Sequence, residues 1–351
     1  MKAAVWYAAH DVRVEARTPP AQPADDEVTV RVRWCGICGT DIHEYRMGPQ
    51  VIPVAPHPLT GASGPQVLGH EFAGDVVEVG SGVSEWAPGD RVAVMPLIYC
   101  GRCYYCRRGQ QHMCEILACC GLSWRWGGMA EYVIVKAYQL NRLPDNVSYE
   151  QGALAEPAAV ACYAIERSGM RGGDTVLVAG AGPIGCLTML AAQAAGAAAV
   201  YVSEPAPARR QFAESLGATA VFDPLAVDLP AIVHAQTGGI GVDVAFECVG
   251  LERSLRDCTA ALRKQGTLAQ TGLFVAPATV EPFLWSLRDL TIVGTWCYHV
   301  YDLPRVLALV AAGKLPVERV ITDHIGLDDV VQGGFKPLVA GKHVKILVGV
   351  D

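Results

Sequence analysis

Hydrophobic and polar positions alternate over short runs in the first 150 residues of the chain. Three such runs are V-T-V-R-V-R-W at 28–34, F-A-G-D-V-V-E-V-G at 72–80 and P-G-D-R-V-A-V-M at 88–95. Alternation with a period of two is typical of strands with one buried face, and the Gly and Pro residues between the runs mark turns. The pattern predicts an irregular antiparallel β domain.

Near residue 150 the pattern changes to Ala-rich helical segments that alternate with short apolar runs. The predicted strands cover 175–179, 199–204, 220–223, 242–248 and 266–272. Strands separated by helices predict a parallel, doubly wound sheet. A further helix is predicted at 302–313 and a last strand at 342–350. The prediction is therefore an α/β protein, and a length of 351 residues favours two domains.

The segment 175–203 carries no charged residue and is long enough to cross a bilayer. Glycines and a proline interrupt it early, however, and Ala and Gly supply much of the remainder, so a buried strand–helix–strand unit is the favoured interpretation. The N-terminal residues lack the apolar core of a secretion signal, because His10 and Asp11 interrupt them. We therefore expect the whole chain in the cytoplasm.

The composition narrows the class of protein. Hydrophobic residues make up 51% of the chain and charged residues 18%, which favours a compact enzyme over a disordered segment. A net charge of −7 without any basic run disfavours a nucleic-acid partner. Thirteen cysteines, an odd number without a secretion signal, indicate reduced thiols and metal binding more than disulfides.

The strongest local motif is C-G-R-C-Y-Y-C-R-R-G-Q-Q-H-M-C, which places Cys100, Cys103, Cys106 and Cys114 at C-x2-C-x2-C-x7-C spacing. Four thiolates close together make a complete tetrahedral shell with no position left for substrate, which is typical of a structural zinc site. An iron–sulfur cluster or free thiols are the alternatives. Zinc is favoured, because no Cys-Pro pair follows the last cysteine.

A second motif, V-L-V-A-G-A-G-P-I-G, places G-x-G-x-x-G directly after a predicted strand and at the start of a helix. Glu204 follows 24 residues after the first glycine, at the end of the next strand, where an acidic side chain accepts from both ribose hydroxyls. That acid favours NAD over NADP. Arg209 and Arg210 can be interpreted as phosphate binders or as a solvated helix face. The candidate cofactor contacts are Gly180, Gly182, Pro183, Ile184, Gly185, Glu204 and Arg209.

A third set of residues is dispersed along the chain. The run W-C-G-I-C at 34–38 has the C-x-x-C spacing of a redox dithiol but also of a metal site. With His70, Glu71 and Glu156, Cys38 offers a thiolate, an imidazole and carboxylates, which suit a catalytic zinc with an open position. Taken singly, each residue has an ordinary alternative as a buried thiol, a core histidine or a carboxylate at a helix start.

Taken together, the motifs resemble one family over the whole chain. The ordered set C-G-I-C-G-T-D-I-H-E, L-G-H-E-F-A-G, G-D-R-V, the four-cysteine run, G-G-M-A-E-Y, E-P and G-A-G-P-I-G is similar to the zinc-dependent medium-chain dehydrogenases/reductases. The resemblance implies a GroES-like catalytic domain at 1–153, a Rossmann NAD-binding domain at 154–297, and a segment at 298–351 that completes the catalytic domain. It also implies an active site between the domains.

The same resemblance assigns roles to individual residues. It implies Cys38, His70 and Glu156 as ligands of a catalytic zinc, with Glu71 near them or exchanging with them as a ligand. Thr40 and His43 match the family's proton relay. Two zinc ions per chain, NAD as cofactor and a homodimer or homotetramer follow from it. Because W-C-G-I-C follows a predicted strand instead of opening a helix as a redox dithiol would, Cys35 is expected to be a buried thiol without chemistry.

Within the family, the stretch at 43–72 is most similar to the 2,3-butanediol dehydrogenases, as are S-E-P-A-P-A-R-R and V-D-V-A-F-E-C-V-G. The expected reaction is the oxidation of a secondary alcohol or vicinal diol, most simply 2,3-butanediol to acetoin, and the reverse. A polyol dehydrogenase of the sorbitol type or an L-threonine dehydrogenase is the alternative. Trp124 and Trp126 either narrow the substrate pocket or cover the zinc lobe, and Trp296 and Tyr298 either line the pocket or pack in the core.

Overall fold

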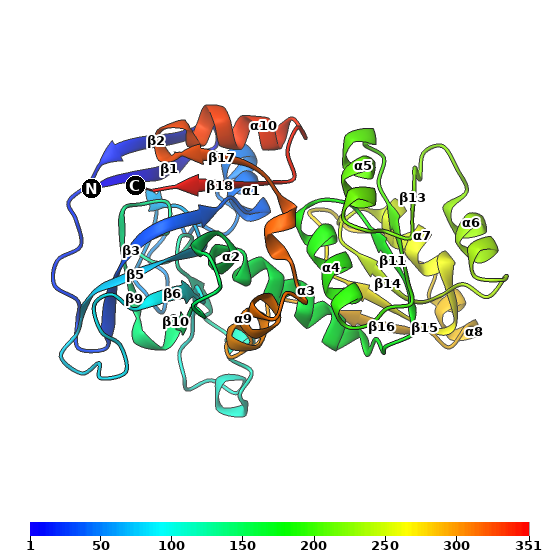
Figure 1. Ribbon diagram of the computed structural model, residues 1–351, viewed down its shortest axis with the longest axis horizontal. Helices are drawn as coiled ribbons and strands as arrows, with labels where there is room; N and C mark the ends of the chain where they lie inside the picture. The colour runs from blue at the N-terminus through cyan, green and yellow to red at the C-terminus, as the bar shows by residue number, and fades with distance from the viewer. Residues whose placement is uncertain (351) are drawn as a thin grey trace. The chain divides into compact units, whose positions relative to one another are not determined.

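The computed structural model describes residues 1–350, which form two compact units (Figure 1). The first unit contains Met1–Glu156, His299–Gly313 and the chain from Ile321 onward. The second contains Pro157–Tyr298 and Lys314–Val320. Each unit is thus built from segments that are distant in the sequence.

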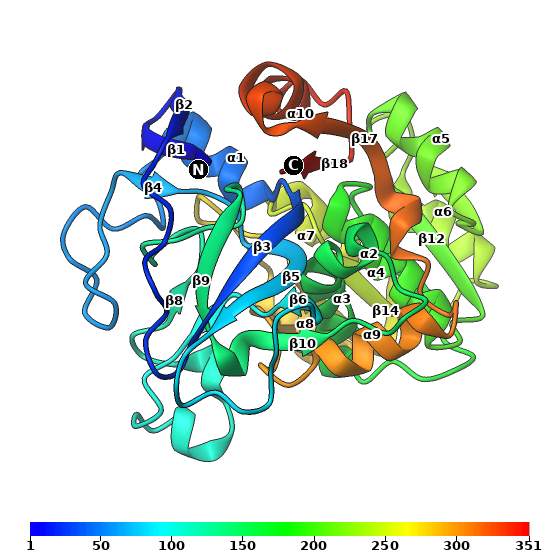
Figure 2. The same cartoon turned by 60° about the vertical axis from the view of Figure 1, so that its left-hand side comes forward.

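The largest sheet of the first unit is built around one long strand, β3 (Glu27–Gly36). The strand order is β10-β6-β5-β3-β18-β17, and β9 also pairs with β3 (Figure 2). The bounds of the partner strands are β5 Glu71–Val79, β6 Arg91–Val94, β9 Tyr132–Lys136, β10 Leu140–Arg142, β17 Ile321–Gly326 and β18 Lys345–Gly349. The alternating runs predicted at 28–34, 72–80 and 88–95 correspond to β3, β5 and β6, so these predictions are confirmed.

Two smaller sheets and several short helices complete this unit. The sheets are β2-β1-β4 and β7-β8, with β1 Lys2–Ala8, β2 Asp11–Ala16, β4 Gln66–Val67, β7 Leu97–Ile98 and β8 Ala118–Cys119. The α-helices are α1 Gly39–Met47, α2 Tyr149–Ala153, α9 Leu303–Ala311 and α10 Lys336–Val339, while α3 Ala155–Ser168 starts at the end of the unit. A π-helix, Val330–Phe335, precedes α10.

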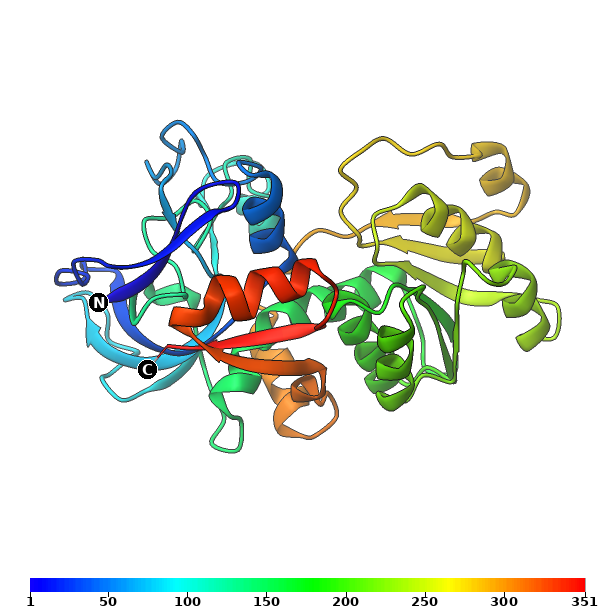
Figure 3. The ribbon, with the colours of Figure 1, turned by 90° about the horizontal axis from the view of Figure 1, so that it is seen from above.

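The C-terminal segment is joined to the N-terminal strands of the first unit by hydrogen bonds. Strand β18 pairs antiparallel with the end of β3, with Leu347 opposite Gly36 and Gly349 opposite Trp34. Figure 3 shows the red C-terminal strands beside the blue N-terminal part of the chain. This pairing brings residues near 345 to the end of β3, where Cys35 and Cys38 lie.

The second unit contains a six-stranded parallel sheet with the order β13-β12-β11-β14-β15-β16. Its strands are β11 Thr175–Ala179, β12 Ala199–Ser203, β13 Ala220–Phe222, β14 Val242–Glu247, β15 Leu262–Gln270 and β16 Thr291–Gly294. The helices are α4 Pro183–Ala194, α5 Pro207–Ser215, α6 Leu229–Gln236, α7 Glu252–Ala261 and α8 Pro282–Leu287. The five predicted strands and the doubly wound class are confirmed.

The order of this sheet reverses between β11 and β14, and Figure 1 shows α4 and α5 on one face with α6 and α7 on the other. Right-handed crossovers on both sides of such a reversal place the helices in this way and leave a crevice at the carboxyl ends of the strands. The apolar segment predicted as a buried unit forms β11, α4 and β12, and most of α4 is buried. Within the described residues, no helix has the length and apolar character needed to cross a membrane.

Candidate active site

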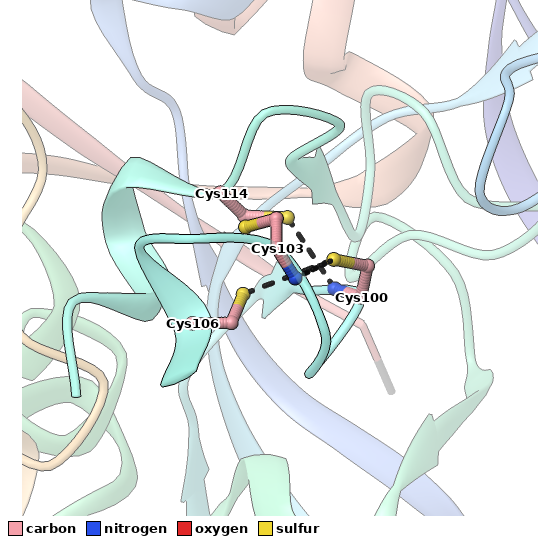
Figure 4. A group of neighbouring side chains, drawn as sticks. All are labelled: Cys100, Cys103, Cys106 and Cys114. Carbon is pink, nitrogen blue, oxygen red and sulfur yellow. Dashed lines mark hydrogen bonds between the residues drawn. The ribbon is translucent and has the colours of Figure 1, made fainter. Parts of the chain in front are cut away.

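The four cysteines of the 100–114 run come together in one lobe of the first unit (Figure 4). Their sulfur atoms all lie within 4.8 Å of one another, and the Cys100 and Cys106 sulfurs are 4.0 Å apart. Zinc–sulfur bonds of about 2.3 Å in a tetrahedron separate the sulfurs by about 3.8 Å, so the cluster has the size of a zinc site. All thirteen cysteines lie within the described residues, and no disulfide bond joins any two of them.

Backbone N–H groups make the lobe favourable for thiolates. The amides of Cys100 and Cys103 donate to the sulfurs of Cys114 and Cys100, at 3.4 and 3.3 Å. Donation from the Cys106 and Glu115 backbones lowers the pKa of Cys103 to about 6. Burial, in contrast, raises the pKa of Cys106 to about 12. Only a bound cation would ionise all four thiols together, which fits a metal in this lobe.

A second group of candidate ligands forms in the first unit. The ligand atoms of Cys38, His70 and Glu71 all lie within 4.8 Å of one another, although Cys38 is 32 residues from His70 in the sequence. Cys38 is the N-cap of α1, and Glu71 begins β5, which pairs with the end of β3. A thiolate, an imidazole and a carboxylate so close together suit zinc.

Two glycines leave room for this group. A Cβ added to Gly36 would lie 2.1 Å from a carboxylate oxygen of Glu71, so the glycine of W-C-G-I-C makes space for that carboxylate. Gly69 has a φ of +98°, and a Cβ there would lie 2.6 Å from the Met129 amide nitrogen. The turn that presents His70 therefore requires glycine.

Asp41 is part of the site, although no role was predicted for it. It is fully buried, and its Oδ2 accepts the backbone N–H of Cys38 at 3.0 Å. Its Oδ1 lies 3.6 Å from Nδ1 of His70. At this distance the two groups attract each other without a hydrogen bond, so Asp41 places a negative charge beside the His70 ring. Burial raises the pKa of Asp41, against the lowering effect of His70.

Negative charge is concentrated around His70. Burial would lower the pKa of His70, but attraction to Cys38, Asp41 and Glu156 outweighs burial and raises it well above its ordinary value. Glu156 is itself buried at the start of α3. It is outside the group of ligand atoms that lie within 4.8 Å of one another, but its charge acts on His70. A dication at this centre would meet strong negative potential.

Lys345 is the second unpredicted member of the site. Only 1% of its side chain is exposed, and its ammonium group donates to the Glu71 carboxylate and to the carbonyl oxygen of Ile37, the latter at 3.0 Å. Burial would lower the pKa of Lys345, but Glu71 and Cys38 outweigh it and raise the pKa. A lysine is almost never fully buried unless it is paired. Strand β18 thus supplies a positive charge directly behind a candidate zinc ligand.

The candidate relay residues lie on α1. Thr40 and His43 are three residues apart, so they share one face of the helix. The Thr40 hydroxyl lies 3.7 Å from the Cys38 sulfur, and both relay residues are partly exposed. Cys35, in contrast, is fully buried in β3, and burial raises its pKa well above the ordinary value. The two cysteines of W-C-G-I-C therefore lie in different environments, one on a strand and one at a helix start.

The glycine motif of the second unit has a distinct geometry at each glycine. Gly180 has a φ of +95°, and Gly182, the N-cap of α4, has open space where a Cβ would point. A Cβ on Gly185 would lie 1.9 Å from the Gly180 carbonyl oxygen. These are the turn, the open approach and the close helix–strand contact of a dinucleotide-binding loop. Pro183 and Ile184 form the first turn of α4, beside that opening.

Glu204 lies just after β12 and is 5% exposed. Its Oε2 accepts the N–H of Ala181 and its Oε1 accepts that of Ala206, both at 2.9 Å. Each carboxylate oxygen keeps a second lone pair, so Glu204 both holds the glycine loop and can accept from a ribose. Arg210 is paired with Asp223 at 3.0 Å, whereas Nε of Arg209 is buried with no hydrogen-bond partner among the described residues.

The tryptophans occupy two kinds of environment. Trp124 is 9% exposed and donates from Nε1 to the Ile134 carbonyl oxygen at 2.9 Å, so it packs in the core of the first unit. Tyr298 is fully buried. Trp296, in contrast, is 47% exposed and lines a cavity of about 480 Å³ at the carboxyl ends of β15 and β16. Other lining residues are Leu255, Gln270, Gly272, Leu273 and Thr295.

Comparison with known proteins gives matches along the chain. Residues 24–145 match the model of the alcohol dehydrogenase GroES-like domain, and residues 183–312 match that of the zinc-binding dehydrogenases. The (R,R)-butanediol dehydrogenase of Bacillus subtilis is 42% identical over 352 residues, covering 99% of each chain. The chain belongs to the zinc-binding alcohol dehydrogenase family.

Solved structures of the family are also similar to this one. The crystal structure of 2R,3R-butanediol dehydrogenase from Bacillus subtilis has a TM-score of 0.94 and 40% identity, covering 100% of this chain and 99% of the other. A zinc-binding dehydrogenase from Sinorhizobium meliloti, bound to NADP, has a TM-score of 0.89 and 35% identity, covering 99% of this chain and 98% of its own. The GroES-like and Rossmann-type fold expected from the motifs is thereby confirmed.

Both donor sets fit the metal that the family name implies. The lobe offers four sulfurs in a closed group, and the second group offers Cys38, His70 and Glu71, with the Asp41 carboxylate beside the His70 ring. Asp41 and Lys345 escaped the sequence analysis for different reasons. Asp41 lies within the motif C-G-T-D-I-H-E. It is three residues after Cys38, and this spacing indicates a carboxylate that caps the start of a helix. Lys345 had no local signal.

Proposed function

We propose that this protein is an NAD-dependent zinc dehydrogenase that oxidises a secondary alcohol or vicinal diol to the ketone, with 2,3-butanediol and acetoin as the substrate pair. The observation that carries the proposal is the 42% identity to a butanediol dehydrogenase over nearly the entire length of both chains. The gathering of Cys38, His70 and Glu71 supports it, because a catalytic zinc needs three protein ligands and an open position.

In the proposed site, Cys38 and His70 hold the metal together with Glu71 or Glu156. The metal supplies Lewis acidity, which lowers the pKa of a substrate hydroxyl. Thr40 accepts the hydroxyl proton, and His43, on the same face of α1, passes it towards solvent. NAD supplies the hydride acceptor, so the residues of the protein orient the alcohol and move its proton. The four-cysteine lobe holds a second, structural zinc.

We propose NAD in preference to NADP, because a 2′-phosphate would bring its negative charge against the buried Glu204 carboxylate. The Gly180–Gly185 loop and the N-terminus of α4 receive the pyrophosphate. Arg209, whose Nε is buried without a partner among the described residues, is the candidate for an additional contact to the cofactor. Comparing kcat/KM for NAD with kcat/KM for NADP tests the preference. Equal values for the two cofactors would contradict it.

We also propose that the protein is a homo-oligomer of the cytoplasm. Strand β16 lies at an edge of the six-stranded sheet, and the side chains of Phe283, Leu287 and Ile292 beside that edge are 75%, 64% and 38% exposed. A two-fold axis through such an edge would pair two β16 strands and cover these apolar groups. The mass in solution tests the assembly: a monomer would contradict it. Thirteen cysteines without a disulfide bond among the described residues fit a reducing compartment, and cell fractionation tests that location.

The deciding experiment measures NAD reduction with the stereoisomers of 2,3-butanediol, sorbitol and L-threonine side by side, on protein whose zinc content has been counted. The expected result is turnover of at least one butanediol stereoisomer with a kcat/KM well above that for sorbitol and threonine, at two zinc ions per chain. Turnover of sorbitol without turnover of the diol would refute the substrate assignment. One zinc per chain would refute one of the two metal sites.

A further inference from the structure

The turn after β14 is organised by one buried carboxylate. Glu247, the last residue of β14, is 0% exposed. Its Oε1 accepts the backbone N–H groups of Val249 and Gly250, each at 2.9 Å, and the hydroxyl of Ser254 at 2.6 Å. These donors belong to the β14–α7 turn and to the first turn of α7. Hydrogen bonds to a charged acceptor are stronger than those between neutral groups, so the turn is firmly held.

The same residue also holds the turn after β15. The carbonyl oxygen of Glu247 accepts the N–H groups of Thr271 and Gly272, at 2.9 and 2.8 Å. A Cβ added to Gly272 would lie 2.6 Å from Oε2 of Glu247 and 2.4 Å from the amide nitrogen of Gly250. The turns after β14 and β15 are therefore packed against each other with Glu247 between them.

A third turn rests on this pair. A Cβ added to Gly180, the first glycine of the dinucleotide motif, would lie 2.8 Å from Cγ2 of Val249. Val249 is one of the residues whose backbone N–H binds Glu247. The Gly180 turn and the turn after β14 follow neighbouring strands, because β11 and β14 pair in the sheet. A change at Glu247 therefore acts on the carboxyl edge of the sheet, where a dinucleotide binds.

The position of these turns selects one half of the cofactor. In the proposed site, Glu204 receives the adenosine ribose beside β12, on one side of β11. Strands β14 and β15 lie on the other side of β11 and therefore face the nicotinamide half. The 480 Å³ cavity lies at that side, and Gly272, whose N–H donates to Glu247, is part of its wall.

We propose that Glu247 is a positioning residue for the nicotinamide half of the cofactor. Its carboxylate and carbonyl oxygen fix the turns after β14 and β15, which form the wall against which that half binds. The inference rests on the proposed NAD-dependent function. It adds a residue that does not touch the cofactor but determines the shape of one of its two binding regions.

The experiment compares two probes on the zinc-loaded protein. NADH contains both halves of the cofactor, whereas AMP is the adenosine half alone. Glu247→Gln keeps the size of the side chain but removes the charge and places an N–H2 group among backbone donors. We expect the Kd for NADH to rise about tenfold or more. The Kd for AMP should stay within about twofold of the unaltered protein, since the adenosine region lies on the other side of β11.

Ser254→Ala is the milder variant, because it removes a single donor to Oε1 of Glu247. It should raise the Kd for NADH in the same direction by a smaller factor, and it keeps the test open if Glu247→Gln does not fold. Thr259→Ala is the matched control, because the Thr259 hydroxyl is on the same helix but donates to the Leu255 carbonyl oxygen, at 2.7 Å, instead of to Glu247. The control should bind both probes like the unaltered protein.

Each outcome decides between the alternatives. Weakened NADH binding with unchanged AMP binding supports the positioning role. Equal weakening of both probes means that Glu247 only stabilises the fold, and unchanged binding of both means that the turns do not depend on it; either result overturns the inference. If the unaltered protein itself binds neither probe, the proposed NAD-dependent function fails instead, so the two failures are distinguishable.

Discussion

Replacing Lys345 with methionine tests whether the buried pair with Glu71 stabilises the first unit. Methionine has an unbranched side chain of similar length but lacks the charged ammonium group and its N–H donors. Both partners are 1% exposed, so the Glu71 carboxylate would remain buried without its cation, and the Ile37 carbonyl oxygen would lose a donor at 3.0 Å. Removing one partner of a buried ion pair costs about 3–5 kcal/mol. We expect a loss of this size in the free energy of unfolding.

Urea unfolding with a common slope m measures the loss, and the zinc content of each variant is counted so that metal loss is not mistaken for loss of the pair. Lys336→Met is the matched control: this lysine is exposed on α10 and donates to Gln332, so we expect a change below about 0.5 kcal/mol. Adding Glu71→Gln to the Lys345 variant should cost less than the sum of the single changes. A loss below about 1 kcal/mol for Lys345→Met, or strict additivity, would refute the reasoning.

Three further predictions concern the metal sites and one partly buried acid, Asp243. Cys100→Ser should reduce the zinc content from two ions per chain to one, counted by atomic absorption, and an unchanged count would contradict the closed four-sulfur site. Cys38→Ser should abolish turnover while Cys35→Ser preserves it, and equal loss at both would restore the dithiol interpretation. At Asp243, burial would raise the pKa, but hydrogen bonds from Arg263 and the Thr175 backbone and hydroxyl outweigh it and lower the pKa below 3.8. Its contribution to stability is therefore present above about pH 4 and is lost as the pH falls through the folded-state pKa. The difference in the free energy of unfolding between the unaltered protein and Asp243→Asn should shrink below pH 4. A difference that grows below pH 4 would contradict the prediction.

Much of the fold could be predicted because its signals are local. The alternating runs became β3, β5 and β6, and the glycine motif opens α4, since period and turn chemistry act over a few residues. Strands β1 and β17 were not predicted. Strand β17 is partly exposed over most of its length, so its sequence I-T-D-H-I-G carries little alternation of apolar and polar positions. Its place beside β18 is set by pairing across the sheet rather than by its own composition.

The site was predictable only where a motif carried the residue. His70 and Cys38 stand in motifs that are quotable from the sequence, and the structure places their ligand atoms together with that of Glu71. The partners that act on them have no such signal. Lys345 is 274 residues from Glu71, and a lone lysine in a strand reads as a surface residue. Glu247 likewise reads as a strand end, because its partners are backbone amides, which any sequence supplies.

The charges at the candidate zinc centre explain why a lysine from β18 is needed there. Cys38, Asp41, Glu71 and Glu156 bring several acidic groups around His70, and the pKa values of both His70 and Asp41 are raised, which are the shifts that crowded negative charge and burial produce. A dication would neutralise the charge of the groups that bind it, but the acidic groups that do not bind it would keep their charge. Lys345 adds one positive charge on the side of Glu71 that faces β18. The C-terminal strand therefore contributes to the electrostatics of the centre as well as to the sheet, so loss of its pairing with β3 should weaken metal retention before it unfolds the unit.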